Sequence, residues 1–129
     1  MSHRFPVRIY YEDTDFSGNV YHAAYLKFFE RGRTEFLREE GIHHSELAAQ
    51  GIAFAVRSME IAFDDAAHID DLLVVTTEVA AVSGARLTLR QAILRDDTVL
   101  TRATVIVVAI KTSGGPTRMP RVILERFGS

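Results

Sequence analysis

Two kinds of hydrophobic spacing divide the chain into an opening strand, one long helix and four further strands. Apolar and polar residues alternate from Phe5 to Tyr11, which predicts a half-buried strand. From Tyr21 to Leu37 the apolar residues recur at intervals of three and four, which predicts a helix with a wide apolar stripe. Gly32 within this helix costs about 1 kcal/mol relative to Ala, so we expect it to contact a strand backbone closely. Residues 43–50 are expected to form a short second helix.

Strand spacing returns after Gly51. It predicts four strands, at Ile52 to Phe63, Leu72 to Val82, Ala85 to Arg95 and Thr98 to Lys111. Asp96-Asp97 is expected to join the last two strands as a tight hairpin. The run from Val105 to Ile110 is continuously apolar, which predicts burial of both of its faces. The tail beyond about residue 113 holds Pro120 and only a brief apolar stretch, so we expect it to be loosely ordered.

One apolar helix and several long antiparallel strands predict an α+β domain whose sheet curls around a central helix. The length of 129 residues favours one domain over residues 1–129. A sheet wrapped on one helix has a single core face, yet the last long strand is apolar on both sides. Because an uncovered apolar face usually marks an oligomer contact, we expect at least a dimer.

Composition narrows the classes of function. The net charge is −2 and no basic block occurs, so nucleic acid is not an expected partner. Cysteine is absent, which excludes disulfides, thiolate metal sites and a cysteine nucleophile. The N-terminal residues show no apolar signal core, and no apolar run is long enough to cross a bilayer. We therefore expect a cytoplasmic protein without a transmembrane segment, and no glycine-rich motif points to a dinucleotide cofactor.

Residues 10–22 carry the most chemistry in the chain. They place Asp13, Asp15, a Ser17-Gly18-Asn19 turn and His22 at the start of the long helix. A helix N-terminus offers free backbone N–H groups and a partial positive charge. A carboxylate offers a base or a nucleophile. The two together are able to polarise a carbonyl group and attack it.

Other interpretations of this motif come from metal binding, acid–base chemistry and turn structure. Asp13 to Gly18 resembles the first half of a calcium-binding EF-hand loop, but Ala24 stands where the loop needs a bidentate Glu. Asp13, Asp15 and His22 match no zinc or iron spacing, so no metal is expected. A hydratase would also use an Asp/His pair. Finally, aspartates are common as turn and N-cap residues, and spacing alone does not choose between that role and catalysis.

Two longer segments carry a resemblance to a known family. They are Tyr11-Glu12-Asp13-Thr14-Asp15-Phe16-Ser17-Gly18-Asn19-Val20-Tyr21-His22-Ala23-Ala24-Tyr25 and Phe29-Glu30-Arg31-Gly32-Arg33-Thr34-Glu35-Phe36-Leu37. They resemble hotdog-fold acyl-CoA thioesterases of the 4-hydroxybenzoyl-CoA thioesterase group, and most of all the bacterial branch associated with the Tol-Pal system. The resemblance implies a long helix wrapped by a curved antiparallel sheet of about five strands. It also implies hydrolysis of a short-chain or aromatic acyl-CoA without a cofactor, in a homodimer or homotetramer with sites at the dimer interface.

The resemblance assigns roles to particular residues. It implies that Asp15 is the catalytic carboxylate, that the backbone N–H of His22 is the donor at the helix N-terminus, and that Asp13 orients the turn. The substrate-binding residues that it suggests are Gly18, Val20, Tyr21, Ser58 (acting across a dimer interface) and Arg86 (for the CoA phosphates).

One departure and two rival functions remain. Residues 63–67 lack the aromatic-rich, proline-containing bend expected after this strand, which leaves the acyl pocket undefined. A hotdog hydratase or dehydratase is one rival, although its Asp/His interval should be shorter than the seven residues between Asp15 and His22. A non-catalytic module that binds acyl-CoA or acyl carrier protein is the other, and the presence of Asp15 argues against it.

Overall fold

The structure, a computed structural model, describes residues 2–128. Its elements in chain order are β1 (His3–Arg8), a 3₁₀ turn (Tyr11–Asp13), α1 (His22–Glu39), α2 (His44–Ala49), β2 (Ile52–Phe63), β3 (Leu72–Val82), β4 (Leu87–Arg95), β5 (Thr98–Lys111), β6 (Pro116–Thr117) and α3 (Arg121–Phe127).

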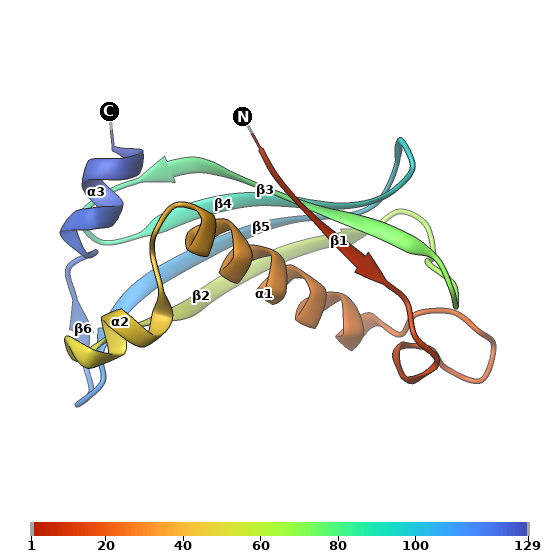
Figure 1. The fold of residues 1–129 in the computed structure, drawn as a ribbon, viewed down its shortest axis with the longest axis horizontal. Coiled ribbons are helices and arrows are strands. Elements are labelled where there is room, and N and C mark those ends of the chain that lie inside the picture. Colours follow the sequence, from red (N-terminus) through yellow and green to blue (C-terminus); the bar gives the residue numbers. More distant parts are fainter. Residues whose placement is uncertain (1, 129) are drawn as a thin grey trace.

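A curved antiparallel sheet forms one layer and α1 lies along its inner face (Figure 1). The long strands follow the order β1-β3-β4-β5-β2, and the two-residue β6 pairs with β5, so the sheet has six strands where about five were expected. One long helix against such a sheet is the hotdog arrangement. The order leaves β1 and β2 at the two edges, and within residues 2–128 β2 pairs with β5 alone.

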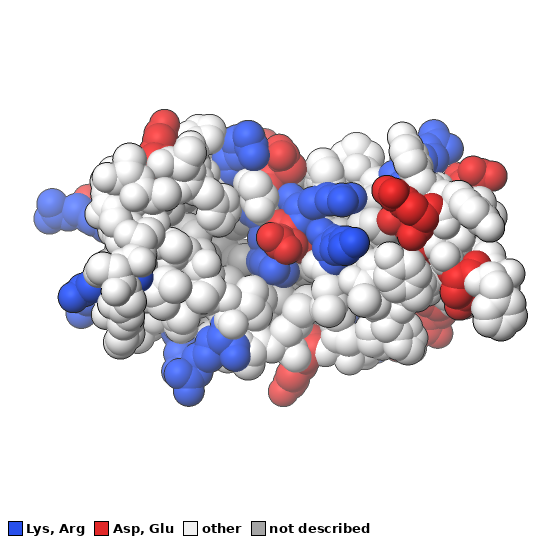
Figure 2. All heavy atoms as spheres, turned by 90° about the horizontal axis from the view of Figure 1, so that it is seen from below, with Lys and Arg blue, Asp and Glu red and all other residues white. Residues whose placement is uncertain are grey.

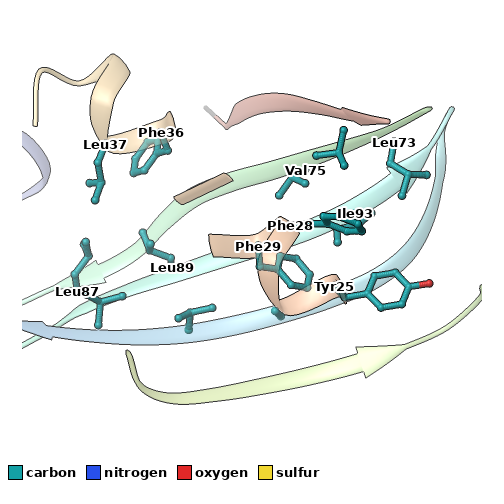
Figure 3. Packing of buried hydrophobic residues seen from close by; sticks show 14 of the residues in the cluster. Tyr25, Phe28, Phe29, Phe36, Leu37, Leu73, Val75, Leu87, Leu89 and Ile93 are labelled. Carbon is teal, nitrogen blue, oxygen red and sulfur yellow. The ribbon is translucent and has the colours of Figure 1, made fainter. Parts of the chain in front are cut away.

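The two sides of α1 differ as the apolar stripe predicts. Lys27, Glu30 and Arg31 are exposed, and basic and acidic side chains lie next to one another on the face seen in Figure 2. The opposite side carries Phe28 and Phe29, which are buried against strand residues in Figure 3. The core therefore lies between α1 and the sheet.

Gly32 lets the helix approach the sheet. A Cβ atom at this position would lie 2.6 Å from Cγ1 of Val75 on β3, and Val75 is fully buried. A close contact between Gly32 and a strand is present, but its nearest atoms belong to the Val75 side chain, whereas a strand backbone was expected. This contact fixes α1 against the middle of the sheet and so fixes where the N-terminal end of α1 lies.

The predicted bounds of β2, β3 and β5 agree with the structure, and the hairpin at Asp96-Asp97 is confirmed by the pairing of Arg95 with Thr98. The prediction for the first strand was wrong, because β1 ends at Arg8 and Tyr11 lies in the 3₁₀ turn. The reason is local: the N–H of Tyr10 donates to the Asp13 carboxylate at 2.9 Å, which bends the chain away from the sheet.

Two further expectations need correction. The tail beyond residue 113 contains β6 and α3, in which Ile123 is fully buried and Phe127 stacks on Phe36 with ring centroids 5.5 Å apart. The apolar run in β5 is buried on one face only, with Val105, Val107 and Ala109 inside. Its other residues, Ile106, Val108 and Ile110, are half-buried on the outer face.

Candidate active site

A tight turn places Asp15 ahead of α1. The N–H of Asp15 donates to the carbonyl of Asn19 at 2.9 Å, and the N–H of Gly18 donates to the carbonyl of Asp15 at 3.0 Å. Gly18 has φ 85°, in the left-handed region that favours glycine. The turn reverses the chain direction, so that Val20 forms an antiparallel β-bridge with Thr14. The helix begins two residues after Val20.

The Asp15 carboxylate is exposed and uses one of its oxygens locally. Oδ1 accepts hydrogen bonds from the hydroxyl and the N–H of Ser17, at 2.5 and 2.8 Å. Hydrogen bonding to the hydroxyl, then to the N–H, lowers the pKa of Asp15 below its ordinary value. Oδ2 accepts no hydrogen bond within residues 2–128. The side chain is therefore an ionised carboxylate with one free oxygen.

Asp13 has a different place. Its Oδ2 accepts the N–H of Tyr10, and its carbonyl accepts the N–H of Tyr21 at 3.4 Å. These bonds tie the 3₁₀ turn to the start of α1. The bonds of Asp13 therefore lie within the turn and the helix start, whereas Asp15 keeps one carboxylate oxygen free of hydrogen bonds within residues 2–128.

His22 is the first residue of α1, and Tyr21 caps the helix with an extended backbone (φ −78°, ψ 152°). No side chain caps this end, and the N–H of His22 has no hydrogen-bond partner in the described part of the chain. The imidazole stacks on Phe63 at the end of β2, with ring centroids 4.1 Å apart and planes 16° apart. The helix thus presents a free donor beside an aromatic pair.

A cleft of about 510 Å³ joins these groups. Its lining residues come from the Asp15 turn, the start of α1 and the segment after β2: Asp15, Asn19, Val20, Tyr21, His22, Tyr25, Phe63, Asp64, Asp65 and Ala66. We call it the Asp15 cleft. The contribution of residues 63–66 was missed by the sequence analysis, which noted residues 63–67 only as a departure from the expected bend. No local signal shows that Phe63 meets a histidine 41 residues earlier.

The suggested residues Ser58 and Arg86 lie away from this cleft, and so does Glu30 in the second of the two resembling segments. Ser58 is an exposed residue in the middle of β2, beside a bulge at Arg57. Arg86 follows the far end of β3, which spans ten residue steps or about 33 Å from the Asp15 end. Glu30, two turns into α1, lines a separate hollow of about 270 Å³ near Phe54 and Val56.

Other features of the described residues bear on the class of site. A hollow of about 540 Å³ lies on the outer face of the sheet, among the Glu78–Arg90 pair and Arg102. Among the described residues that line this hollow, none lies at a helix terminus, so it lacks the pairing of a carboxylate with a helix N-terminus. Within residues 2–128, no group of three or more His, Asp or Glu residues is arranged to hold a metal ion. None of the described helices has the length and apolar character needed to cross a membrane.

Comparison with known proteins identifies the family. Residues 10–127 match the model of the thioesterase-like superfamily. The chain is 49% identical over 125 residues to the acyl-CoA thioesterase YbgC of Haemophilus influenzae, covering 95% of this chain and 92% of that protein. It is 40% identical over 126 residues to the acyl-CoA thioester hydrolase YbgC of Escherichia coli, covering 96% and 94%.

A solved structure gives the same result. The probable thioesterase from Bartonella henselae superposes with a TM-score of 0.89 at 46% identity, covering 93% of this chain and all of that one. The family model's range of residues 10–127 includes the Asp15 turn, α1 and β2 to β5. The chain belongs to the thioesterase-like superfamily.

Proposed function

We propose that this protein is an acyl-CoA thioester hydrolase whose reaction takes place in the Asp15 cleft. The main observation in support is that Asp15, with a free carboxylate oxygen, and His22, with an unbonded backbone N–H, line the same cleft. The names of the YbgC relatives support the acyl-CoA substrate. The reaction frees an acid and CoA and uses neither a metal nor a cofactor.

The chemistry follows from these two groups. The N–H of His22 and the partial charge of the helix end polarise the thioester carbonyl as negative charge develops on its oxygen. In one route Asp15 attacks the carbonyl carbon, the C–S bond breaks to release the CoA thiolate, and water hydrolyses the resulting anhydride to the free acid and Asp15. In the other route Asp15 takes a proton from a water that attacks the same carbon, and the C–S bond breaks to give the acid and CoA. Both roles need an ionised carboxylate, and the hydrogen bonds that lower the pKa of Asp15 favour that form.

The experiment is a thiol-release assay on a panel of acyl-CoAs with two matched variants. Asp15→Asn should keep the fold and lose about a hundredfold or more in turnover. Asp13→Asn keeps an oxygen acceptor for the Tyr10 N–H and should retain most activity. Near-wild-type turnover by folded Asp15→Asn contradicts the proposal.

The same assay separates the rivals. A hydratase would consume the double bond of an enoyl-CoA without freeing thiol. A binding module would bind acyl-CoA and release nothing. The seven-residue interval between Asp15 and His22 and the stacking of the imidazole on Phe63 favour the hydrolase.

The functional unit that we propose is at least a dimer formed through β2. This strand is 12 residues long and carries exposed Val56 and Phe63, and in the described part of the chain it pairs on one side only. A long open edge of this kind is a template for pairing with another strand. Pairing of β2 with its copy about a two-fold axis places Ser58 at the interface.

The two-fold axis also reverses the direction of the second copy. Its Ile52 end then lies beside the Phe63 end of the first β2. In each protomer Arg86 lies toward the Ile52 end of β2. Arg86 of the partner subunit therefore lies toward the Asp15 cleft of the first protomer, where it is a candidate to bind the CoA phosphates. Light scattering at micromolar concentration should give twice 14.4 kDa or more; an active species of 14.4 kDa contradicts the shared site.

A further inference from the structure

The loop of residues 64–71 forms one wall of the Asp15 cleft and also holds the Asp15 turn. Asp64, Asp65 and Ala66 line the cleft. The next residues pair with the turn: the N–H of Val20 donates to the carbonyl of Ala67 at 2.9 Å, and the N–H of Ile69 donates to the carbonyl of Gly18 at 3.0 Å. Any shift of this loop is therefore passed to residues 18–20, which hold the backbone of Asp15 through the carbonyl of Asn19.

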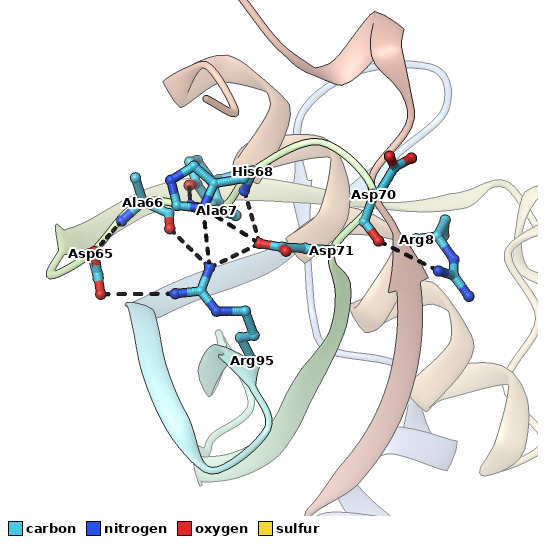
Figure 4. A network of polar contacts seen from close by, with 9 residues as sticks. Arg8, Asp65, Ala66, Ala67, His68, Asp70, Asp71 and Arg95 are labelled. Atoms are coloured by element: carbon cyan, nitrogen blue, oxygen red, sulfur yellow. Dashed lines mark hydrogen bonds and ion pairs between the residues drawn. The ribbon is translucent and has the colours of Figure 1, made fainter. Parts of the chain in front are cut away.

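One side chain from the sheet joins the two ends of this loop (Figure 4). Arg95, the last residue of β4, donates through Nη1 to Oδ2 of Asp71 at 2.8 Å and to the carbonyl of Ala66 at 3.2 Å. Its Nη2 lies 4.0 Å from Oδ2 of Asp65. The guanidinium has five N–H donors in a rigid plane, which suits it to hold several acceptors at fixed positions.

Asp71 completes the connection. The oxygen that accepts from Arg95 also accepts the N–H of His68 at 2.9 Å, which closes the loop on itself. Burial alone would raise the pKa of Asp71, but the hydrogen bonds from His68 and Arg95 outweigh it and lower that pKa. Both partners are partly buried, with side chains 29% and 21% exposed. Such a pair is screened less by solvent than an exposed one.

The loop also holds a strained residue, which shows that its shape is imposed by its surroundings. Asp70 has φ 71°, a left-handed conformation that few residues other than glycine adopt. It is held there between Ile9, whose carbonyl accepts its N–H at 3.1 Å, and the ion pair at the next residue. Strain of this kind persists only where neighbouring contacts determine the backbone.

We propose that Arg95 is a positioning residue for the reaction: through Asp71 and the loop it fixes the Asp15 carboxylate relative to the N-terminus of α1. It touches neither group. This inference rests on the proposed function, because the geometry that Arg95 maintains is that of the Asp15 cleft. Displacement of a reacting group by about 1 Å costs up to about a hundredfold in rate.

The test compares Arg95→Gln with a matched variant, Arg90→Gln. Arg90 lies on the same strand and pairs with Glu78 at 3.2 Å, but on the outer face of the sheet. Arg95→Gln should lower kcat about tenfold or more with KM changed less than about twofold, and Arg95→Lys should recover part of the loss. Arg90→Gln should leave both constants unchanged. Equal losses in the two variants overturn the proposal, as does a wild-type kcat in Arg95→Gln.

A measurement that does not depend on turnover separates this proposal from the function itself. Arg95→Gln should speed hydrogen exchange at the amides of Val20 and Ile69, while amides in the middle of β4 exchange as in the wild type. Asp71→Asn should give the same pattern, and its effect should not add to that of Arg95→Gln. Unchanged exchange at Val20 overturns the positioning role. A wild-type protein that frees no thiol overturns the proposed function instead.

Discussion

Replacement of His22 by Pro and by Ala separates the backbone donor of α1 from the imidazole. Both variants lack the ring, so the ratio of their turnover numbers isolates the N–H group. The structure indicates that Pro fits at this position. His22 is the first residue of the helix, where Pro is common, and Tyr21 already has the extended conformation that a residue before Pro adopts. The N–H that Pro deletes has no partner within residues 2–128.

The two losses differ in size. Stacking of the imidazole on Phe63 at 4.1 Å is worth about 0.5–1.5 kcal/mol, so His22→Ala should lower kcat by at most about tenfold. Loss of one oxyanion donor costs about 3–4 kcal/mol, or about a hundred- to a thousandfold. His22→Pro should therefore be at least about tenfold slower than His22→Ala.

The assay is release of free thiol from an acyl-CoA by each purified variant, with circular dichroism and a thermal melt to confirm the fold. Equal turnover in folded His22→Pro and His22→Ala would show that this N–H is not the donor. If His22→Ala is as inactive as Asp15→Asn, the imidazole is itself an acid or base. That second result would favour the hydratase.

Three further changes test the surroundings of the cleft. Gly32→Ala should stabilise the helix by about 1 kcal/mol through helix propensity, but crowding against buried Val75 should cost about 1–3 kcal/mol. The melting temperature should therefore fall by a few degrees, and a rise would contradict the close contact. Ser17→Ala removes the hydroxyl that lowers the pKa of Asp15. The acid limb of the pH profile of kcat/KM should therefore move to higher pH, while activity at neutral pH is retained. An unmoved acid limb would contradict the assignment of that limb to Asp15. Tyr25→Phe leaves a buried loop N–H without its acceptor at 3.0 Å and should destabilise the protein by about 1–3 kcal/mol, which denaturant unfolding measures; wild-type stability would argue against that bond.

The strands were the most predictable part of the fold, because alternation is a local property. The bounds of β2 and β3 follow from their own side chains. Two elements were not predictable in this way. The Asp13 carboxylate ends β1 early by accepting the N–H of Tyr10, a local side-chain bond that alternation does not show. α3 depends on distant contacts, including the stacking of Phe127 on Phe36 of α1 and the bond from Arg126 to Glu40, just after α1, at 2.7 Å.

In the candidate site, too, the local part was predictable from the sequence and the part formed by distant contacts was not. The motif from residue 10 to 22 shows part of the cleft, since its turn and helix start are encoded next to one another. Residues 63–66 also line it, because Phe63 at the end of β2 packs against His22 and Tyr25 of α1. Arg95 has no motif around it. Its connection to Asp71 spans 24 residues and depends on the pairing of β3 with β4.

Electrostatic catalysis at this helix end depends on what covers it. A helix terminus stabilises developing charge most where water is excluded, yet within one protomer Asp15 is exposed and Phe16 is fully exposed beside it. In the dimer that we propose, the Ile52 end of the partner's β2 would lie beside Phe63 and would cover this end of the cleft. Each protomer would then hold the reacting groups, and the partner would exclude water from them. On this argument kcat should fall when dilution separates the protomers, although every residue that touches the thioester carbonyl is unchanged.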